Sequence, residues 1–211
     1  MHRDIFHSGR WAAFLLLIWI SLLSLPAKAQ ETELSEYSRP EFKVYKSLSA
    51  ALANPDSVYI LDLSGKKLKE IPPGVFTLKN LQVLDLGRNK LKTVPAEITL
   101  LWQLIELDLS SNKFEEFPEN VTRLKGLRKL SLNRNVIAVI PPSIASMESL
   151  QILELWDNEI GTLPDEMGQL RNLKVLELRG ILFSEEQHQQ FREMLPNTEI
   201  MLSPSCNCKT F

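Results

Sequence analysis

The sequence predicts an α/β solenoid in which short parallel strands stack into one concave sheet. Three observations predict it. The chain realigns with itself every 23 residues from Val58, seven positions of each of the first five units are apolar, and a proline recurs at the fifteenth position. One such unit buries too little apolar surface to offset the entropy of ordering its backbone, so the units must stack on one another. Length and composition agree, since 211 residues with 44% apolar and 24% charged side chains are typical of a globular chain.

Net charge and the scarcity of metal-binding residues exclude several classes of protein. The net charge of −2 and the sequence pI of about 6.0 give the chain no general attraction to nucleic acid. Two cysteines and three histidines are too few for a disulfide-stapled miniprotein and for most zinc modules. The function must therefore come from the order of the residues within the repeats.

Residues 1–29 have the features of a secretory signal peptide. A basic start is followed by an apolar run from Trp11 to Leu25 and by Ala27-Lys28-Ala29, which fits an A-x-A cleavage site. The apolar run has about 15 residues, fewer than the roughly 20 that a membrane-spanning helix needs. We expect the mature chain to begin at Gln30, to have no membrane span, and to be exported to the periplasm, the cell surface or the medium. An uncleaved anchor is the alternative.

Residues 30–57 predict a polar lead-in followed by an N-terminal helical cap. The segment Ser38-Arg39-Pro40-Glu41 has the spacing of a capping box, which starts a helix. Pro55 then ends the helix. The apolar residues that follow the capping box at helical intervals are Tyr45, Leu48 and Leu52.

Residues 58–183 form six units of 23 residues, the last of them partial, with no insertion or deletion. The seven apolar positions of the second unit are Leu81, Leu84, Leu86, Leu91, Val94, Ile98 and Leu101. Asparagine recurs at the ninth position of four units, as Asn89, Asn112, Asn135 and Asn158. The recurring prolines are Pro72, Pro95, Pro118, Pro141 and Pro164.

This pattern resembles the leucine-rich repeat family in its 23-residue form, and the stretch from Leu104 to Asn112 shows the motif well. The resemblance covers residues 58 to about 183, and the flanking segments are similar to the caps of secreted bacterial members. It implies a horseshoe arc and recognition of other proteins. Two positions depart from the motif, because Lys66 and Ile181 stand where the first and sixth units should have asparagine. Terminal repeats are commonly atypical in this way.

The residue types support the same fold on physical grounds. Alternation of leucine with other residues gives a short strand with the leucines on one side. Asparagine at the ninth position can turn its amide inward and satisfy backbone groups of the adjacent turn. Proline at the fifteenth fixes φ where the chain returns without pairing. The sequence thus predicts a parallel sheet on the concave side and short, turn-like connections with little regular helix outside.

Residues 184–204 predict a C-terminal cap made of a helix and a strand. Ser184-Glu185-Glu186-Gln187 is a second capping box, and the helix is expected to run to Pro196. Glu199–Leu202 is expected as a final short strand. Residues 205–211 form a tail with Cys206 and Cys208, which we expect as free thiols or as partners of another molecule. A disulfide between residues two apart would be strained.

Residues typical of catalysis or of cofactor binding do not form a recognisable motif. His188 is the one histidine of the expected mature chain, and we expect it as a solvated residue of a helix. The chain has no H-E-x-x-H, no glycine-rich phosphate loop and no G-x-S-x-G. Two cysteines with a distant histidine lack a fourth metal ligand. We therefore expect no enzymatic activity, no cofactor and no metal.

Side chains at the third, fifth and seventh positions of each unit are expected on the concave side, because the leucines at positions four and six point inward. The fifth position carries Asp62, Asp85, Asp108, Ser131, Glu154 and Glu177. This acidic column either forms a docking strip for a basic partner or merely solvates the sheet. For the column alone, solvation is the favoured interpretation.

Trp156, at the seventh position, is the preferred contact residue. A tryptophan on the open side of a sheet exposes apolar area without a gain in folding, and tryptophan and arginine are enriched among interface hot spots. Arg134 and Arg179 are expected on either side of it, so a local cation–π stack is the alternative. Trp102 is expected on the outer face, where it shields the return loops. The residues expected to contact a partner are Trp156, Arg134, Arg179, Glu154, Asp108, Asp85 and Arg88.

Taken together, these features predict a non-catalytic protein-binding module that recognises a protein partner through the concave face of the sheet. The chain is expected to be exported and to bind no nucleic acid. Two alternatives remain open at this point. One is a structural component of the cell envelope, and the other is an accessory subunit that presents substrate to an enzyme.

Overall fold

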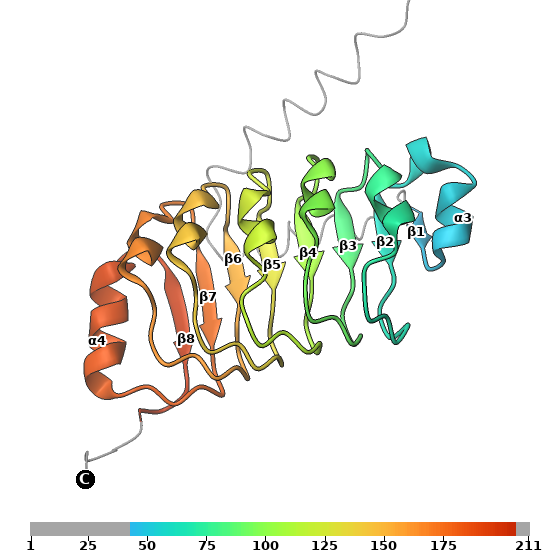
Figure 1. Cartoon of the computed structure of the whole chain (residues 1–211). Coiled ribbons are helices and arrows are strands. Elements are labelled where there is room, and N and C mark those ends of the chain that lie inside the picture. The colour runs from blue at the N-terminus through green and yellow to red at the C-terminus, as the bar shows by residue number, and fades with distance from the viewer. Residues whose placement is uncertain (1–42, 206–211) are drawn as a thin grey trace, which may run out of the picture. The chain divides into compact units, whose positions relative to one another are not determined.

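The computed structural model describes residues 43–205, which form one eight-stranded parallel sheet (Figure 1). The strands lie side by side in chain order, and each pairs with the next in parallel. This arrangement confirms the predicted solenoid. The strands are β1 (Val44–Tyr45), β2 (Ile60–Asp62), β3 (Val83–Asp85), β4 (Glu106–Asp108), β5 (Lys129–Ser131), β6 (Ile152–Glu154), β7 (Val175–Leu178) and β8 (Glu199–Leu202).

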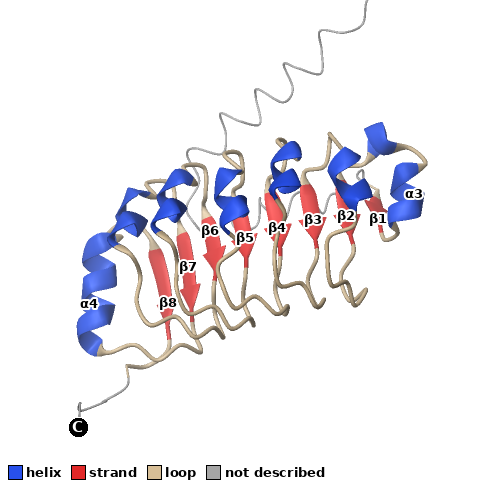
Figure 2. Ribbon diagram, in the orientation of Figure 1, coloured by secondary structure: helices blue, strands red, loops and turns tan. Residues whose placement is uncertain are grey.

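Short 3₁₀ helices make up the regular structure of the return segments, as Figure 2 shows beside the strands. The repeated proline lies directly before each of them, where its fixed φ and missing N–H cost the turn no hydrogen bond. The predicted turn-like connections are therefore confirmed. These helices are η4 (Pro73–Thr77), η5 (Ala96–Leu100), η6 (Glu119–Arg123), η7 (Pro142–Ser146) and η8 (Asp165–Gln169), and η3 (Pro55–Ser57) precedes β2.

The repeated apolar positions build one continuous core. All of them in the first five units are buried except Leu68, which is half-buried and packs against the core. The strand leucines lie in register from unit to unit, as Leu84, Leu107 and Leu130 do. Each fully buried leucine contributes roughly 1.5–3 kcal/mol to folding. Since every unit shares its core with its neighbours, the units stabilise one another.

The repeated asparagines form a ladder of hydrogen bonds beneath the strands. The Asn135 Nδ2 donates to the carbonyl oxygens of Leu132 and Leu109 at 2.8 and 3.2 Å, and its Oδ1 accepts from the Phe114 N–H at 3.1 Å. Asn89, Asn112 and Asn158 make the equivalent three contacts. The predicted inward turn of the amide is confirmed.

Each asparagine of the ladder satisfies backbone groups of its own unit and of the unit before it. The Asn89 Oδ1, for example, accepts from the Leu68 N–H of the first unit at 3.0 Å. The first unit has no repeat before it, so it can carry Lys66 at its ninth position, where the side chain is exposed. Ile181 of the last unit is instead buried.

The eighth position of all six units has a left-handed backbone, a feature that the sequence analysis did not predict. Its φ is 66° at Gly65 and 77° at Gly180, and it lies between 52° and 55° at the four non-glycine residues. At Gly180 a side chain would also collide with Asp157. At the other positions the conformation costs about 1–2 kcal/mol. The non-glycine residues are Arg88, Ser111, Arg134 and Asp157.

The predicted N-terminal helix is wrong in its extent. Tyr45 lies in β1, where it pairs with Leu61 of β2 and is 5% exposed, and helix α3 spans only Leu48–Leu52. The edge of β2 that faces away from β3 exposes backbone donors and acceptors, and β1 satisfies them by pairing. The expected capping box at residues 38–41 and the expected signal peptide lie outside the described residues.

The C-terminal helix and strand lie where the sequence predicts them. Helix α4 spans Glu185–Met194, and the capping box at Ser184 is complete: its Oγ accepts from the Gln187 N–H at 3.2 Å, while the Gln187 Oε1 accepts from the Ser184 N–H at 3.0 Å. Strand β8 pairs with β7. No helix in residues 43–205 is long and apolar enough to cross a membrane. Cys206 and Cys208 lie outside the described residues.

Candidate functional site on the concave face

The concave face is the set of strand side chains opposite the core leucines, at the third, fifth and seventh positions of the units. In-register pairing of the parallel strands places equal positions side by side, about 4.8 Å apart. The acidic column is therefore a continuous row that runs across the sheet. It consists of Asp62, Asp85, Asp108, Ser131, Glu154 and Glu177.

Several carboxylates of this row bind the backbone that follows the strand. Oδ1 of Asp85 accepts from the Gly87 N–H at 2.8 Å, and Oδ1 of Asp108 accepts from the Ser110 N–H at 2.7 Å. Asp62 does the same with the N–H of Ser64. One oxygen of each aspartate thus stabilises the turn after its strand, which supports a structural role for this part of the row. The aspartate two residues before a serine or glycine is the signal that could have indicated it.

The surroundings shift the pKa values of Asp85 and Asp62 in opposite directions. Burial raises the pKa of Asp85, and the charges of Asp108 and Asp62 add to this effect against the Gly87 hydrogen bond. Burial also tends to raise the pKa of Asp62, but two hydrogen bonds from Ser64 and the charges of nearby lysines outweigh it, so the Asp62 pKa is lowered. Asp85 therefore holds its negative charge with less compensation than Asp62.

Two charged residues stand at the third position in the middle of the sheet, where the flanking strands carry Val83 and Ile152. These residues are Glu106 and Lys129, which are paired in register. The Lys129 ammonium does not bind Glu106 closely but lies 3.1 Å from Oε1 of Glu154. Burial lowers the pKa of Lys129, yet the charge and hydrogen bond of Glu154 exceed this effect and leave it raised.

Glu106 is the least compensated carboxylate of the concave face. Its Oε1 is buried and has no hydrogen-bond partner among the described residues. Burial raises its pKa from 4.5 to about 7, against the opposing charge of Lys129. The Asn133 Oδ1 is also buried without a partner there, and the Asn133 side chain is only 9% exposed. The sequence analysis included neither residue in the site, although a glutamate at a position that holds isoleucine or valine in four of the six units was a visible signal.

Trp156 and Arg134 form the cation–π stack that was the alternative interpretation. The Arg134 Cζ lies 4.7 Å from the centroid of the Trp156 ring, and its Nε lies 3.7 Å from Oδ2 of Asp157. Trp156 is therefore half-buried rather than fully open to solvent. The left-handed backbone of Arg134 fixes the direction in which its side chain leaves the chain.

Arg179 follows Trp156 in the seventh-position row, as expected, but its guanidinium binds Glu177, and the cation–π contact with Trp156 comes from Arg134. The Arg179 Nε and Nη2 donate to the two carboxylate oxygens of Glu177 at 2.7 and 2.6 Å, because the two residues lie on the same side of the strand. Arg88 is exposed at its left-handed position. Of the seven expected contact residues, the structure thus brings together Trp156 with Arg134 and Asp85 with Asp108, and it joins Glu154 to Lys129.

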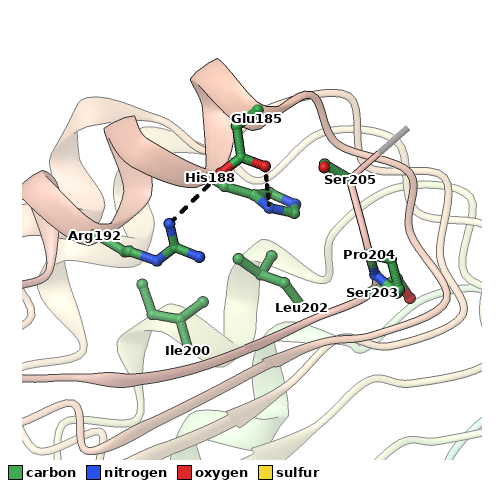
Figure 3. Close-up of a pocket in the computed structure, with 8 residues that line it drawn as sticks. All are labelled: Glu185, His188, Arg192, Ile200, Leu202, Ser203, Pro204 and Ser205. Carbon is green, nitrogen blue, oxygen red and sulfur yellow. Dashed lines mark ion pairs between the residues drawn. The ribbon is translucent and has the colours of Figure 1, made fainter. Parts of the chain in front are cut away.

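Two further expectations need correction. Trp102 does lie outside the core, but it is 68% exposed and so shields little of the return loops. His188 is 4% exposed rather than solvated, and it is one of the residues that line a shallow pocket of about 510 Å³ between α4 and β8 (Figure 3). Its Nδ1 lies 4.0 Å from the Glu185 carboxylate. Within residues 43–205, no group of three acidic, histidine or cysteine side chains could hold a metal ion.

Comparison with known proteins assigns the repeats to a family. The family description "Leucine rich repeat" matches residues 56–114 and 125–180, which together make up more than half of the chain. Comparison with curated proteins finds no match.

Solved structures give the same picture of the fold. A leucine-rich repeat protein of Leptospira interrogans is 39% identical over 67% of this chain, with a TM-score of 0.59. An internalin of Listeria monocytogenes is 18% identical over 75% of this chain, also with a TM-score of 0.59, and shows similarity of fold alone. A TDR receptor is 28% identical over 69% of this chain, with a TM-score of 0.58. The chain spans 35%, 46% and 26% of these three structures.

Proposed function

Since the chain belongs to the leucine-rich repeat family, we propose that it is a non-catalytic protein that recognises a protein partner through its concave face. Leucine-rich repeats are generally protein-interaction scaffolds. The observation that carries the proposal is that Trp156 stays only half-buried at this face although Arg134 stacks on its ring, with 4.7 Å between the guanidinium carbon and the ring centroid. Tryptophan and arginine are the residue types that most often dominate the binding energy of interfaces.

The stack is suited to binding because it presents a large side chain in a fixed orientation. The Arg134 guanidinium stacks on the Trp156 ring, and its Nε lies 3.7 Å from Oδ2 of Asp157, with which it forms an ion pair. Ordering these side chains before a partner arrives lowers the entropy that association must offset. The ring is only half-buried, so a partner can still remove apolar area from water at this point.

The proposal includes export of the chain and the absence of catalysis. The segment 1–29 supports export, because its apolar run is short and ends at a small-residue cleavage site. Mass spectrometry of the exported protein is expected to show an N-terminus at Gln30. A protein that keeps Met1 or the apolar run after export would contradict this part of the proposal.

Capture of the partner on intact cells tests the proposed function. We would crosslink the protein in place and identify the captured proteins for the unaltered chain, for Trp156→Ala, and for Glu119→Ala as a control on the outer side. One protein is expected to be captured by the unaltered chain and by Glu119→Ala, but to be lost or strongly reduced with Trp156→Ala.

Other outcomes would assign a different function. A partner lost with Glu119→Ala but retained with Trp156→Ala would place binding on the outer loops. Firm association with cell wall or outer membrane, without any saturable protein partner, would instead support a structural component of the envelope. Either result would overturn recognition through the concave face.

A further inference from the structure

Five exposed lysines lie in the turns that follow the strands of the first three units. These turns lie side by side along the edge toward which the strands point (Figure 1). The lysines are Lys67, Lys90 and Lys113 at the tenth position of the units, and Lys69 and Lys92 at the twelfth. We call these five residues the lysine edge.

Backbone hydrogen bonds between units fix the spacing of the lysine edge. The Lys90 N–H donates to the Leu68 carbonyl at 2.7 Å, and the Lys113 N–H donates to the Leu91 carbonyl at 2.9 Å. Leu91 is buried, so Lys90 and Lys92 on either side of it face the solvent. The lysines of successive units therefore recur at about the spacing of neighbouring strands, about 4.8 Å.

The positive charge of the lysine edge is only partly neutralised. The Lys92 Nζ lies 3.2 Å from Oε1 of Glu115, and both side chains are mostly exposed, so this pair is weak. The other four lysines form no ion pair or side-chain hydrogen bond with the described residues. Glu70 and Glu116 lie at the thirteenth position of the same turns and are exposed as well. Five lysines thus stand against three glutamates along this edge.

The fold does not require lysine at these positions. The tenth position of the fourth, fifth and sixth units carries Val136, Glu159 and Leu182. The backbone contact is nevertheless the same, since the Val136 N–H donates to the Phe114 carbonyl at 3.0 Å. Like charges on neighbouring strands repel each other, so a row of lysines adds no stability to the stack. Binding of an anion explains why they are concentrated there.

We propose that the lysine edge binds a linear acidic polysaccharide through its carboxylate or sulfate groups. Such a polymer carries its charges at short, regular intervals, as the edge carries its lysines. A lysine ammonium is a hydrated point charge on a flexible stem, so it can follow a flexible chain without a preformed pocket. Several weak contacts along one polymer then add up to useful affinity. This activity is separate from recognition of a protein by the concave face and does not rest on it.

Other anionic macromolecules fit the lysine edge less well. Proteins that lie on membranes combine basic residues with exposed apolar ones, and protein interfaces depend on aromatic or arginine anchors. Single-stranded nucleic acid is bound by stacking on aromatic side chains. Residues 66–70, 89–93 and 112–116 contain no exposed large apolar side chain, no exposed aromatic and no arginine. Charge alone is available, which suits a polymer that is held by charge.

Titration of the purified protein with heparin, a linear polysaccharide with sulfate and carboxylate groups, tests the proposal. Calorimetry at low salt would compare the unaltered protein with two triple variants that lose the same charge. Denaturant melts confirm that both variants are folded. The edge variant is Lys67→Gln/Lys90→Gln/Lys113→Gln, and the control variant changes three exposed residues of the return segments, Lys79→Gln/Arg123→Gln/Lys125→Gln.

The proposal predicts that the edge variant binds heparin tenfold or more weakly than the unaltered protein, while the control variant stays within about twofold. Heparin affinity should fall as the salt concentration rises, and less steeply for the edge variant, because fewer charges make contact. Neutral dextran should not bind. Poly-L-glutamate and vesicles that contain phosphatidylglycerol should bind at least tenfold more weakly than heparin.

Several results would overturn the proposal. Equal losses in the two triple variants would mean that heparin responds to net charge and not to the lysine edge. Poly-L-glutamate or vesicles bound as tightly as heparin would assign the edge to acidic proteins or to lipid surfaces. Absence of heparin binding at low salt would leave the edge without this function.

The test is independent of the proposed function. Trp156→Ala should bind heparin as the unaltered protein does, because Trp156 lies on the concave face of the fifth unit and outside the lysine edge. Loss of heparin binding with Trp156→Ala would place the polysaccharide on the concave face and overturn the lysine edge. Failure to capture a protein partner on cells would overturn the proposed function alone.

Discussion

The interior and the concave face of the solenoid differ in how much the residue type varies from one strand to the next. Inside, Leu84, Leu107, Leu130 and Leu153 repeat without variation and pair in register across four strands. On the concave face, the third position changes from Val83 to Glu106, Lys129 and Ile152 over the same four strands. Both rows belong to the same backbone. The interior row therefore encodes folding, whereas the concave face, which we propose as the binding surface, departs from strict repetition.

The polar groups differ between the two regions in the same way. Every ladder asparagine has its amide oxygen and nitrogen bonded, as Asn135 shows with contacts to Phe114, Leu109 and Leu132. On the concave face, by contrast, Glu106 and Asn133 have buried oxygens without a partner among the described residues. Groups that folding requires are satisfied, whereas the unsatisfied ones cost stability and need another explanation.

The largest effect is expected from a cavity in the interior row. Leu130→Ala should lower the free energy of unfolding by about 2–5 kcal/mol, because Leu130 is completely buried between neighbouring strands. Since the units couple to their neighbours, the loss should destabilise the whole array in one transition. Urea melts measure it, with Val139→Ala, an exposed apolar residue, as the control. A Leu130→Ala melt within about 0.5 kcal/mol of the unaltered protein would contradict the assignment of interior positions.

The asparagine ladder should be nearly as sensitive. Asn135→Ala removes the donor to three carbonyls and the acceptor of the Phe114 N–H, all of them buried, so we expect a loss of about 2–3 kcal/mol in denaturant melts. Asn172→Ala is the control, since its exposed amide donates only to the Glu148 carbonyl. Equal losses at both positions would mean that the ladder adds no stability beyond an ordinary surface hydrogen bond.

Replacement of Glu106 should raise the free energy of unfolding, in contrast to the two changes above, and the size of the gain should depend on pH. The pKa is about 7 in the folded chain against 4.5 normally, so the folded state binds more protons between these values and loses stability as the pH rises through them. Glu106→Gln lacks this loss. Relative to the unaltered protein, it should gain about 1–3 kcal/mol between pH 5 and pH 8. Melts at both pH values measure the gain, and Glu119→Gln should show none.

The smallest effect is expected where the repeat imposes backbone strain. Ser111 has a φ of 52° at the position where the first and last units carry glycine. Ser111→Gly removes the left-handed penalty but adds chain entropy to the unfolded state, so we expect a net gain of about 0.5–1 kcal/mol in stability. A stability decrease in the melt would mean that the serine side chain contributes more than the strain removes.

The sequence was sufficient for the repeated part of the fold. Four independent features of the sequence predict the same stack of parallel strands. They are the 23-residue period, the positions of the leucines, the repeated asparagines and the repeated prolines. Strand β8 and the Ser184 capping box were also predictable, since their signals are local. Strand β1 was not, because two residues that pair with a distant edge have no periodic signal, and Tyr45 also fits a helical spacing.

The site was less predictable because it depends on which side chains meet. The row of carboxylates and the position of Trp156 came directly from the period. Whether Arg134 or Arg179 would stack on the ring depended on competition from Glu177, which binds Arg179 with two hydrogen bonds. Likewise, Glu106 has an oxygen without a partner among the described residues because Lys129 binds Glu154 instead. Sequence spacing places such groups on one face but does not decide among their partners.

The affinity of the captured partner for Trp156→Ala tests the central claim most directly. Calorimetric titration should show binding weakened by about 2 kcal/mol or more, roughly thirtyfold, while denaturant melts show little change in folding stability. Glu119→Ala, on the outer side, should bind as the unaltered protein does. An affinity that is unchanged by Trp156→Ala but lost with Glu119→Ala would contradict the account, since the outer loops would then be the working surface.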